Sequence, residues 1–359
     1  MARDAFQRGC ARLTDEAAHP MSGLLLHGFG FLLNLRAEYA EALAVADRAE
    51  ALSARTGDPF LAFASSAVRG HAYMMQGRPQ AAREALEHVI PSVRAFTEAP
   101  EQRFVGFIAD PQVTVLAMLS LPLSHLGLVR QARERLQEAY TRARHLEQPM
   151  ALLVALWFDA LCAIRFGEAN RLTVLAQEMH SHVEAFGLAQ GKTACRWFRG
   201  WAEARRGKPL EAFREIRSAY EENNALGMIC GSSETLGYAA EALVLQGDLR
   251  GAQAQLEEAH LIVNTYGERI YLPELLLTES AIARARGEDE NAETSVRRAV
   301  AEAREQGARW LELLAITQLC ESEAATLDDR RALATLVGQL KGIDTPAFAK
   351  AKAVLERDS

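Results

Sequence analysis

The sequence predicts an all-α superhelical solenoid of about eight helix hairpins, each near 40 residues long, with capping helices at the C-terminus. Three observations support this prediction. The composition is rich in Ala, Leu, Arg and Glu, which lose little entropy on entering a helix. Glycines recur at a fixed interval, and small residues stand at constant distances from them. A period of this length is typical of repeat proteins.

The first set of glycines marks the turn inside each hairpin. After one interval of 50 residues every step is 40, and the members are Gly77, Gly127, Gly167, Gly207, Gly247 and Gly287. Steps of 40 beyond this set reach Ala37 and Leu327, so the register extends towards both ends of the chain. Glycine just past a helix end adopts the left-handed conformation that other residues resist.

A second set of glycines marks the turn between hairpins. It follows the first by 20 residues, and its members are Gly57, Gly187, Gly227, Gly267 and Gly307. Each unit is therefore expected to read helix, turn, helix, turn, with about 16 residues in each helix.

Small residues recur at three offsets from the first turn. Seven positions before it lie Gly30, Gly70, Ser120, Ala160, Gly200, Ala240, Ser280 and Cys320. Five positions after it lie Ala42, Ala82, Ala132, Leu172, Ala212, Ala252, Ala292 and Ala332. Twelve positions after it lie Ala49, Val89, Ala139, Met179, Ala219, Ala259 and Ala299. Paired helices approach most closely where their side chains are small, and these offsets match the small positions of the tetratricopeptide (TPR) consensus. The period exceeds the usual 34 residues of that repeat.

The remaining segments complete one continuous solenoid. Residues 1–23 are expected to form an N-terminal helix or partial repeat, and residues 24–326 the repeats. The ten extra residues fall in an insertion near 90–111, which contains Pro91, Pro100 and Pro111. It is expected to be an ordered loop or a broken helix, which either packs on its own repeat or forms a flap that contacts a partner. Residues 327–359 are expected to cap the array with helices near 328–341 and 346–356.

Charge and cysteine usage exclude several classes of function. The net charge of −7 argues against direct nucleic-acid binding. The N-terminus lacks the apolar stretch of a signal peptide. Residues 111–129 are uncharged but contain too many polar groups and prolines for a membrane span, so a buried helix is expected there. Five dispersed cysteines without a C-x-x-C pair indicate reduced thiols in a cytoplasmic protein.

Five segments carry a family resemblance. They are ADPQVTVLAMLSL at 109–121, RGWAEARRGKPLEA at 199–212, YGERIYLPELL at 266–276, AREQGARWLEL at 303–313 and GIDTPAFAKAKAVL at 342–355. With them the chain resembles the C-terminal TPR region of large bacterial adenylate-cyclase-like and predicted-ATPase regulators, similar in plan to the maltose-regulon activator. In such proteins the cyclase, DNA-binding and NTPase domains precede this region. The resemblance therefore implies a regulatory, sensing role without cyclase or ATPase activity.

No pattern of catalytic, cofactor or metal-binding residues stands out. Residues 187–193 (GLAQGKT) have three residues between the glycines where a phosphate-binding loop has four, and no strand precedes them. The pair Glu257 and His260 has di-iron spacing but lacks the second copy that such a site requires. We therefore expect no cofactor, no metal and no enzymatic activity.

A candidate binding groove follows from the repeat geometry. The first helix of each hairpin should line the concave surface, and the groove positions that it offers are His71, Met75, His125, Trp157, Arg165, Trp197, Trp201, Arg205 and Glu241. Two pairs, Trp157 with Trp197 and Arg165 with Arg205, lie one repeat apart and should stack as neighbouring rungs. The alternative is that the tryptophans fill the core between repeats and the arginines are solvated.

The expected function is a non-catalytic interaction or sensor module that binds a protein, a peptide or a small inducer in this groove. Arginine grips carboxylates with paired hydrogen bonds, and tryptophan offers a large contact area at little entropic cost. Two alternatives stay open. The chain could be the repeat part of a split NTPase or cyclase-type transcriptional regulator, or it could be a self-associating scaffold that forms a homodimer.

Overall fold

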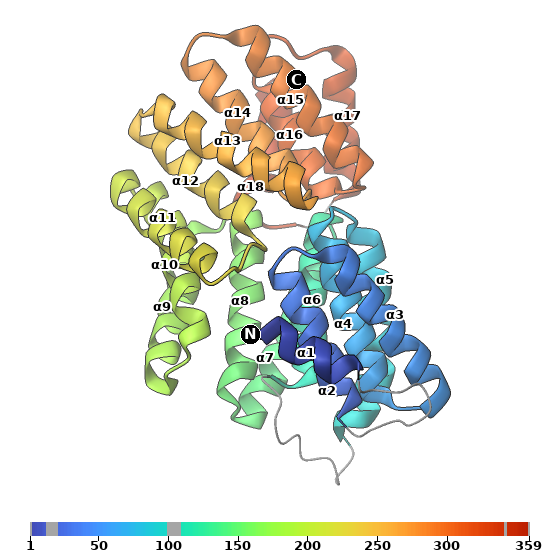
Figure 1. Ribbon diagram of the computed structural model, residues 1–359. Coiled ribbons are helices and arrows are strands. Elements are labelled where there is room, and N and C mark those ends of the chain that lie inside the picture. The colour runs from blue at the N-terminus through green and yellow to red at the C-terminus, as the bar shows by residue number, and fades with distance from the viewer. Residues whose placement is uncertain (1, 12–20, 99–108, 341–342, 358–359) are drawn as a thin grey trace.

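The structure, a computed structural model, describes residues 2–11, 21–98, 109–340 and 343–357. Helices account for 84% of these residues, and no strand occurs among them (Figure 1). The helices are α1 (Ala2–Ala11), α2 (Ser22–Leu35), α3 (Tyr39–Thr56), α4 (Pro59–Met75), α5 (Pro79–Glu98), α6 (Pro111–His125), α7 (Val129–Leu146), α8 (Pro149–Arg165), α9 (Ala169–Phe186), α10 (Ala189–Arg205), α11 (Pro209–Ala225), α12 (Ser232–Gln246), α13 (Leu249–Tyr266), α14 (Leu272–Ala285), α15 (Asp289–Glu305), α16 (Arg309–Cys320), α17 (Leu327–Gln339) and α18 (Pro346–Arg357).

The helices pack in adjacent pairs that follow one another along the chain. Each even-numbered helix from α2 to α16 also packs against the next even-numbered one, and the last of these contacts joins α16 to α18. We call α2, α4, α6, α8, α10, α12, α14, α16 and α18 the inner helices, and α3 to α17 with odd numbers the outer helices. This arrangement agrees with the predicted helical solenoid. Within the described residues, no helix is both long and apolar enough to cross a membrane.

The recurring glycines form the joints between helices, as predicted. Every glycine of both sets has a positive φ, between 64° at Gly187 and 86° at Gly207 and Gly247. Two non-glycine residues among those described have a positive φ, and each stands at a repeat position that glycine otherwise fills. Ala37 (φ 58°) belongs to the first set, and Glu147 (φ 53°) lies 20 residues after Gly127 in the second. The joint thus keeps its left-handed backbone at these two positions although the residue is not glycine.

The small residues lie where helices touch, which confirms their predicted role. A β-carbon added at Gly200 would lie 2.7 Å from Cγ1 of Ile216 and 3.1 Å from the carbonyl oxygen of Ala212 on the neighbouring helix. At Gly70 the same atom would lie 2.7 Å from Cγ of Leu86. Apart from the half-buried Ala332, all members of the three small columns are buried. The close approach of paired helices therefore requires these residue sizes.

The start of the expected insertion is helical, because α5 continues through Pro91 to Glu98; residues 99–108 lie outside the described part of the chain. One predicted detail of the chain path needs correction, because the turn expected at Leu327 is displaced. Leu327 is the first residue of α17, and α16 already ends at Cys320. A capping box starts α17, with Thr326 accepting from the Asp329 backbone N–H at 3.2 Å.

We call α2 to α9 the first half of the array and α10 to α18 the second half. The solenoid curves so that inner helices of the first half meet inner helices of the second half end to end (Figure 1). The carbonyl oxygen of Leu35, at the end of α2, accepts hydrogen bonds at 2.8 and 3.0 Å from the backbone N–H groups of Ile229 and Cys230, just before α12. The carbonyl oxygen of Met75, at the end of α4, accepts one at 3.1 Å from Ile270, just before α14. Each inner helix here meets the one that begins five hairpins later.

Two further pairs of inner helices, also five hairpins apart, meet in the same way. A β-carbon at Gly127, after α6, would lie 3.7 Å from Cβ of Arg309 at the start of α16. One at Gly167, after α8, would lie 3.7 Å from the backbone nitrogen of Ala347 in α18. The negative ends of four inner helices thus face the positive ends of four others, an electrostatically favourable arrangement. We call these four contacts the end-to-end junctions.

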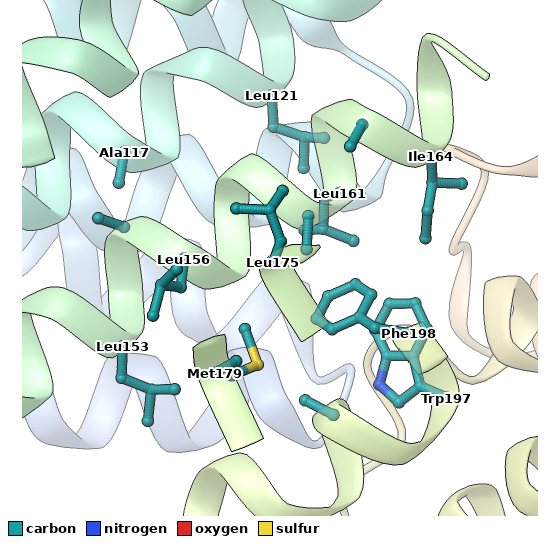
Figure 2. Close-up of a cluster of buried hydrophobic side chains, with 14 of the residues drawn as sticks. Ala117, Leu121, Leu153, Leu156, Leu161, Ile164, Leu175, Met179, Trp197 and Phe198 are labelled. Carbon is teal, nitrogen blue, oxygen red and sulfur yellow. The ribbon is translucent and has the colours of Figure 1, made fainter. Parts of the chain in front are cut away.

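The largest apolar cluster lies between the repeats in the middle of the chain. Figure 2 shows Leu153, Leu156 and Leu161 of α8 facing Leu175 and Met179 of α9, with Trp197 and Phe198 of α10 beside them. These side chains are at most 7% exposed. Burial of this apolar surface is the main force that holds each hairpin to the next.

Candidate functional site

The end-to-end junctions cover the groove positions of the first repeats. Met75 and His125 are buried, and His71 is half-buried with Nε2 3.9 Å from the Cys230 sulfur of the other half. Burial lowers the pKa of His71 to about 4. Burial and the charge of Arg165 hold the pKa of His125 well below its usual value. These three residues lie inside the molecule and face the second half of the array, so they do not line an open surface.

The two tryptophans expected to be neighbouring rungs do meet, but edge to face. The ring centroids of Trp157 and Trp197 are 6.4 Å apart with an interplanar angle of 78°. Trp197 is 5% exposed and stacks on Tyr238 at 6.0 Å. Both tryptophans belong to the apolar cluster of Figure 2, Trp157 at its half-buried margin.

Arg165 is a fully buried cation at the end of α8. Its guanidinium donates to Glu274 of α14, and its Nη2 lies 3.5 Å from Glu234 of α12. It also lies over the ring of Tyr271, 5.3 Å from the centroid. Its carbonyl oxygen accepts a 2.8 Å hydrogen bond from the indole N–H of Trp310, which fixes this turn to α16. Arg165 is therefore bound to the second half of the array through both its charge and its backbone.

Two carboxylates share this one guanidinium. Desolvation raises the pKa of Glu234 to about 8, against the opposing effects of Arg165 and of a 2.5 Å hydrogen bond from the Tyr238 hydroxyl. The pKa of Glu274 is also raised by burial. A pKa near 8 favours the protonated form of the Glu234 carboxyl group at neutral pH.

Trp201, Arg205 and Glu241 form a second, more exposed group. The Arg205 guanidinium lies 3.5 Å from the centroid of the Trp201 ring and donates a 2.6 Å hydrogen bond to Glu241. The side chains of Arg205 and Glu241 keep 33% and 26% of their surface exposed. Arg165 and Arg205, expected to stack as neighbouring rungs, each pair instead with a carboxylate from a later inner helix.

A hollow of about 400 Å³ lies between these two groups, bounded by α8, α10, α12, α14, α16 and the start of α18. Its volume falls in the range of small-molecule sites. Most of its lining falls into four columns spaced by 40 residues. The columns are Arg165, Arg205 and Leu245; Trp201, Glu241 and Ala281; Tyr238, Thr278 and Gln318; and Glu274 with Leu314. We call this hollow the axial pocket.

Two residues of the pocket lining carry buried hydrogen-bond donors without a hydrogen-bond partner within the described ranges. Nε and Nη2 of Arg165 and Nε1 of Trp201 make no hydrogen bond with any described residue, although both side chains are at most 3% exposed. A buried N–H group without an acceptor costs about 1–3 kcal/mol. Such donors are satisfied when a ligand or a water presents an oxygen atom to them.

Among the groove residues named from the sequence, the pocket collects four: Arg165, Trp201, Arg205 and Glu241. Sequence reasoning on the groove did not single out Tyr238, Thr278 or Gln318, which line the same pocket. Their 40-residue spacing could have revealed them, because the three residues occupy the same position in successive repeats. No group of three metal-ligating side chains comes together in the part of the chain that the structure describes.

Comparisons with known proteins give no family for the chain: no protein-family model matches it, and no curated protein matches it significantly. The resemblance to the repeat region of bacterial regulators therefore stays a prediction.

Proposed function

We propose that this chain is a TPR-like sensor module that binds a small molecule in the axial pocket and acts without catalysis of its own. The supporting observation is that Arg165 and Trp201, both in the lining of a hollow of about 400 Å³, carry buried N–H groups that make no hydrogen bond to any described residue. A site of this kind has the apolar walls and few convergent polar groups that small-ligand pockets share.

A small ligand fits this surface better than a long peptide. Of the groove positions in the first repeats, Met75 and His125 are buried, whereas the axial pocket leaves a hollow of about 400 Å³ between the inner helices. The pocket also contacts five inner helices besides the first residues of α18. A ligand there would touch both halves of the array, and its binding energy would favour the closed arrangement. A signalling partner would then bind the closed arrangement at its outer surface.

Thermal unfolding in the presence of fractionated small molecules from a cell extract tests this proposal. We expect at least one fraction to raise the melting temperature, because a ligand that binds only the folded state stabilises it. Ala281→Trp, which places an indole in the pocket, should abolish the increase. Val174→Trp is the matched control, since Val174 is 64% exposed on α9, away from the pocket. An increase that survives Ala281→Trp, or none with any fraction, would contradict the proposal.

A further inference from the structure

The axial pocket has two chemically different walls. On the side of α8 and α10 stand hydrogen-bond donors, namely Arg165, Arg205 and the indole N–H of Trp201. On the side of α12 and α14 stand the carboxyl groups of Glu241 and Glu274. The arginines and the carboxyl groups of the pocket thus come from different pairs of helices and meet in direct ion pairs.

Two ion pairs join these walls, and they differ in how easily a ligand can separate them. In the Arg165–Glu274 pair the Arg165 side chain has no exposed surface and Glu274 keeps 19% of its side chain exposed. The Arg205–Glu241 pair, at 2.6 Å, keeps about a third and a quarter of its two side chains exposed. Separating a partly exposed ion pair costs little free energy, because water solvates both charges. A ligand can thus enter between Arg205 and Glu241 while the inner pair stays in place.

Charge balance decides which ligand can do so. A plain anion at Arg205 would leave Glu241 without a partner, and a plain cation at Glu241 would leave Arg205 without one. A molecule that carries both charges replaces the pair by two new pairs and leaves the net charge of the site unchanged. Its carboxylate would also supply the acceptor oxygen that Nε1 of Trp201 lacks.

The remaining lining suits an apolar substituent. Val244, Leu245, Leu277 and Leu314 complete the walls, together with the ring of Trp201. We infer that the ligand of the axial pocket is a small zwitterion of the amino-acid type, with its carboxylate towards Trp201 and Arg205, its ammonium group towards Glu241, and an apolar side chain against the leucines. This inference rests on the proposed function, whose pocket it uses.

Titration calorimetry with matched probes tests the ligand class. The probes are L-leucine, L-phenylalanine and L-methionine, each beside the amine that lacks its carboxylate and the acid that lacks its amino group. We expect saturable binding of at least one amino acid, with both analogues binding at least about tenfold more weakly, since a lost charge-assisted hydrogen bond is worth 1.4 kcal/mol or more. Equal binding of either analogue, or no binding of any amino acid, overturns the inference.

Variants of the whole chain test the placement. Trp201→Phe keeps the ring but removes the N–H, and Arg205→Gln removes the outer cation at an exposed site; each should weaken binding of the amino acid about tenfold. Arg199→Gln is the matched control, since Arg199 is half exposed on the same helix and pairs with Glu215 away from the pocket. Circular dichroism confirms that each variant is folded. Unchanged affinity in both pocket variants contradicts the placement.

The two proposals fail in different ways. If an extract fraction stabilises the protein, Ala281→Trp abolishes that effect and no amino acid binds, the pocket is a ligand site and only the zwitterion inference is wrong. If no fraction stabilises the protein and no amino acid binds, both are wrong.

Discussion

At the scale of single residues, position within the repeat outweighs residue type. Ala37 and Glu147 adopt the left-handed backbone that glycine occupies at equivalent joints. A residue with a β-carbon pays about 1–2 kcal/mol for that conformation. Among the described residues, no contact of Glu147 itself offsets this cost. Its side chain is exposed, and its backbone N–H, at the end of α7, makes no capping hydrogen bond within the described chain. The packing of α7 and α8 on their neighbours therefore imposes the joint.

Replacing this residue by glycine should stabilise the protein. We expect Glu147→Gly to raise the free energy of unfolding by about 1 kcal/mol, measured by urea denaturation. Gly187→Ala is the converse change one repeat later, at φ 64° with no atom within 4 Å of an added β-carbon, and should lower it by a similar amount. A loss of stability in Glu147→Gly would show that the joint does not carry this strain.

The two arginines of the axial pocket should respond differently to mutation. Arg165→Met leaves Glu274 buried without its cation, so we expect a loss of about 3 kcal/mol of stability. Arg205→Gln removes a partly exposed pair and should cost less than about 1 kcal/mol. Urea denaturation of both variants measures the contrast. Similar losses in the two variants would mean that Arg165 is not the buried structural cation described above.

Glu234 should make stability depend on pH above neutrality. Its pKa rises from 4.5 in the unfolded chain to about 8 in the folded one, so the folded state holds more protons between these values. Its stabilising effect is therefore complete at low pH and is lost as the pH rises through about 8. The buried histidines His27, His71 and His125 act in the opposite sense, but only below about pH 6.5, because burial lowers their pKa values.

The window from pH 7 to 8 lies above the titration of the buried histidines and below that of the unfolded cysteines, whose pKa values burial raises in the folded state. We expect the free energy of unfolding to fall across it in the wild type, by at most about 1.4 kcal/mol per pH unit, and to change less in Glu234→Gln. The groups facing Glu234 are Arg165 of α8, Tyr238 of its own helix, and Tyr271 and Glu274 next to and within α14. Identical pH profiles of the two proteins would mean that Glu234 is ionised at neutral pH.

At the scale of helices, the contacts between paired helices were readable from the sequence because they recur. Gly30, Gly70 and Gly200 all stand seven residues before a joint, and all three approach a side chain of the neighbouring helices closely. The pocket lining was readable in part. Arg165, Trp201, Arg205 and Glu241 were predicted to face the groove, whereas Tyr238 was missed, because Tyr238, Thr278 and Gln318 differ in size and shape along their column.

Two glycine-to-alanine changes within helices should have opposite effects. Gly200→Ala pushes a methyl group against Ile216 and the backbone of α11, so we expect a loss of about 1–3 kcal/mol. Gly338→Ala adds a methyl group in open space in α17 and should gain about 0.5–1 kcal/mol from helix propensity. Thermal or urea unfolding checks both. A neutral Gly200→Ala would contradict the close packing of α10 on α11.

At the scale of the whole molecule, the end-to-end junctions distinguish this array from an open solenoid. They could not be predicted from the sequence, because they depend on the small rotation between repeats, summed over five hairpins. No local sequence pattern indicates this accumulated rotation. The loops that take part, such as Ile229–Cys230 before α12, look like the other joints in the sequence.

Hydrogen exchange should reveal the junctions directly. The backbone N–H groups of Ile229, Cys230 and Ile270 lie in loops but donate to Leu35 and Met75 of the other half. We expect them to exchange as slowly as amides of the core helices, since exchange requires the two halves to separate. Leu188, in the equivalent loop before α10, donates only to Val183 nearby and should exchange faster. Fast exchange at all four positions would indicate that the halves are apart in solution.

These junctions also constrain how the gene can change. An open array tolerates duplication or loss of a unit, because every unit needs only its neighbours. Here, deleting one 40-residue hairpin from the middle would shorten the offset between α2 and α12 from five units to four, and the carbonyl groups of Leu35 and Met75 would lose their partners. The number of units is thus fixed by closure, and homologous chains should vary in their loops while keeping the unit count.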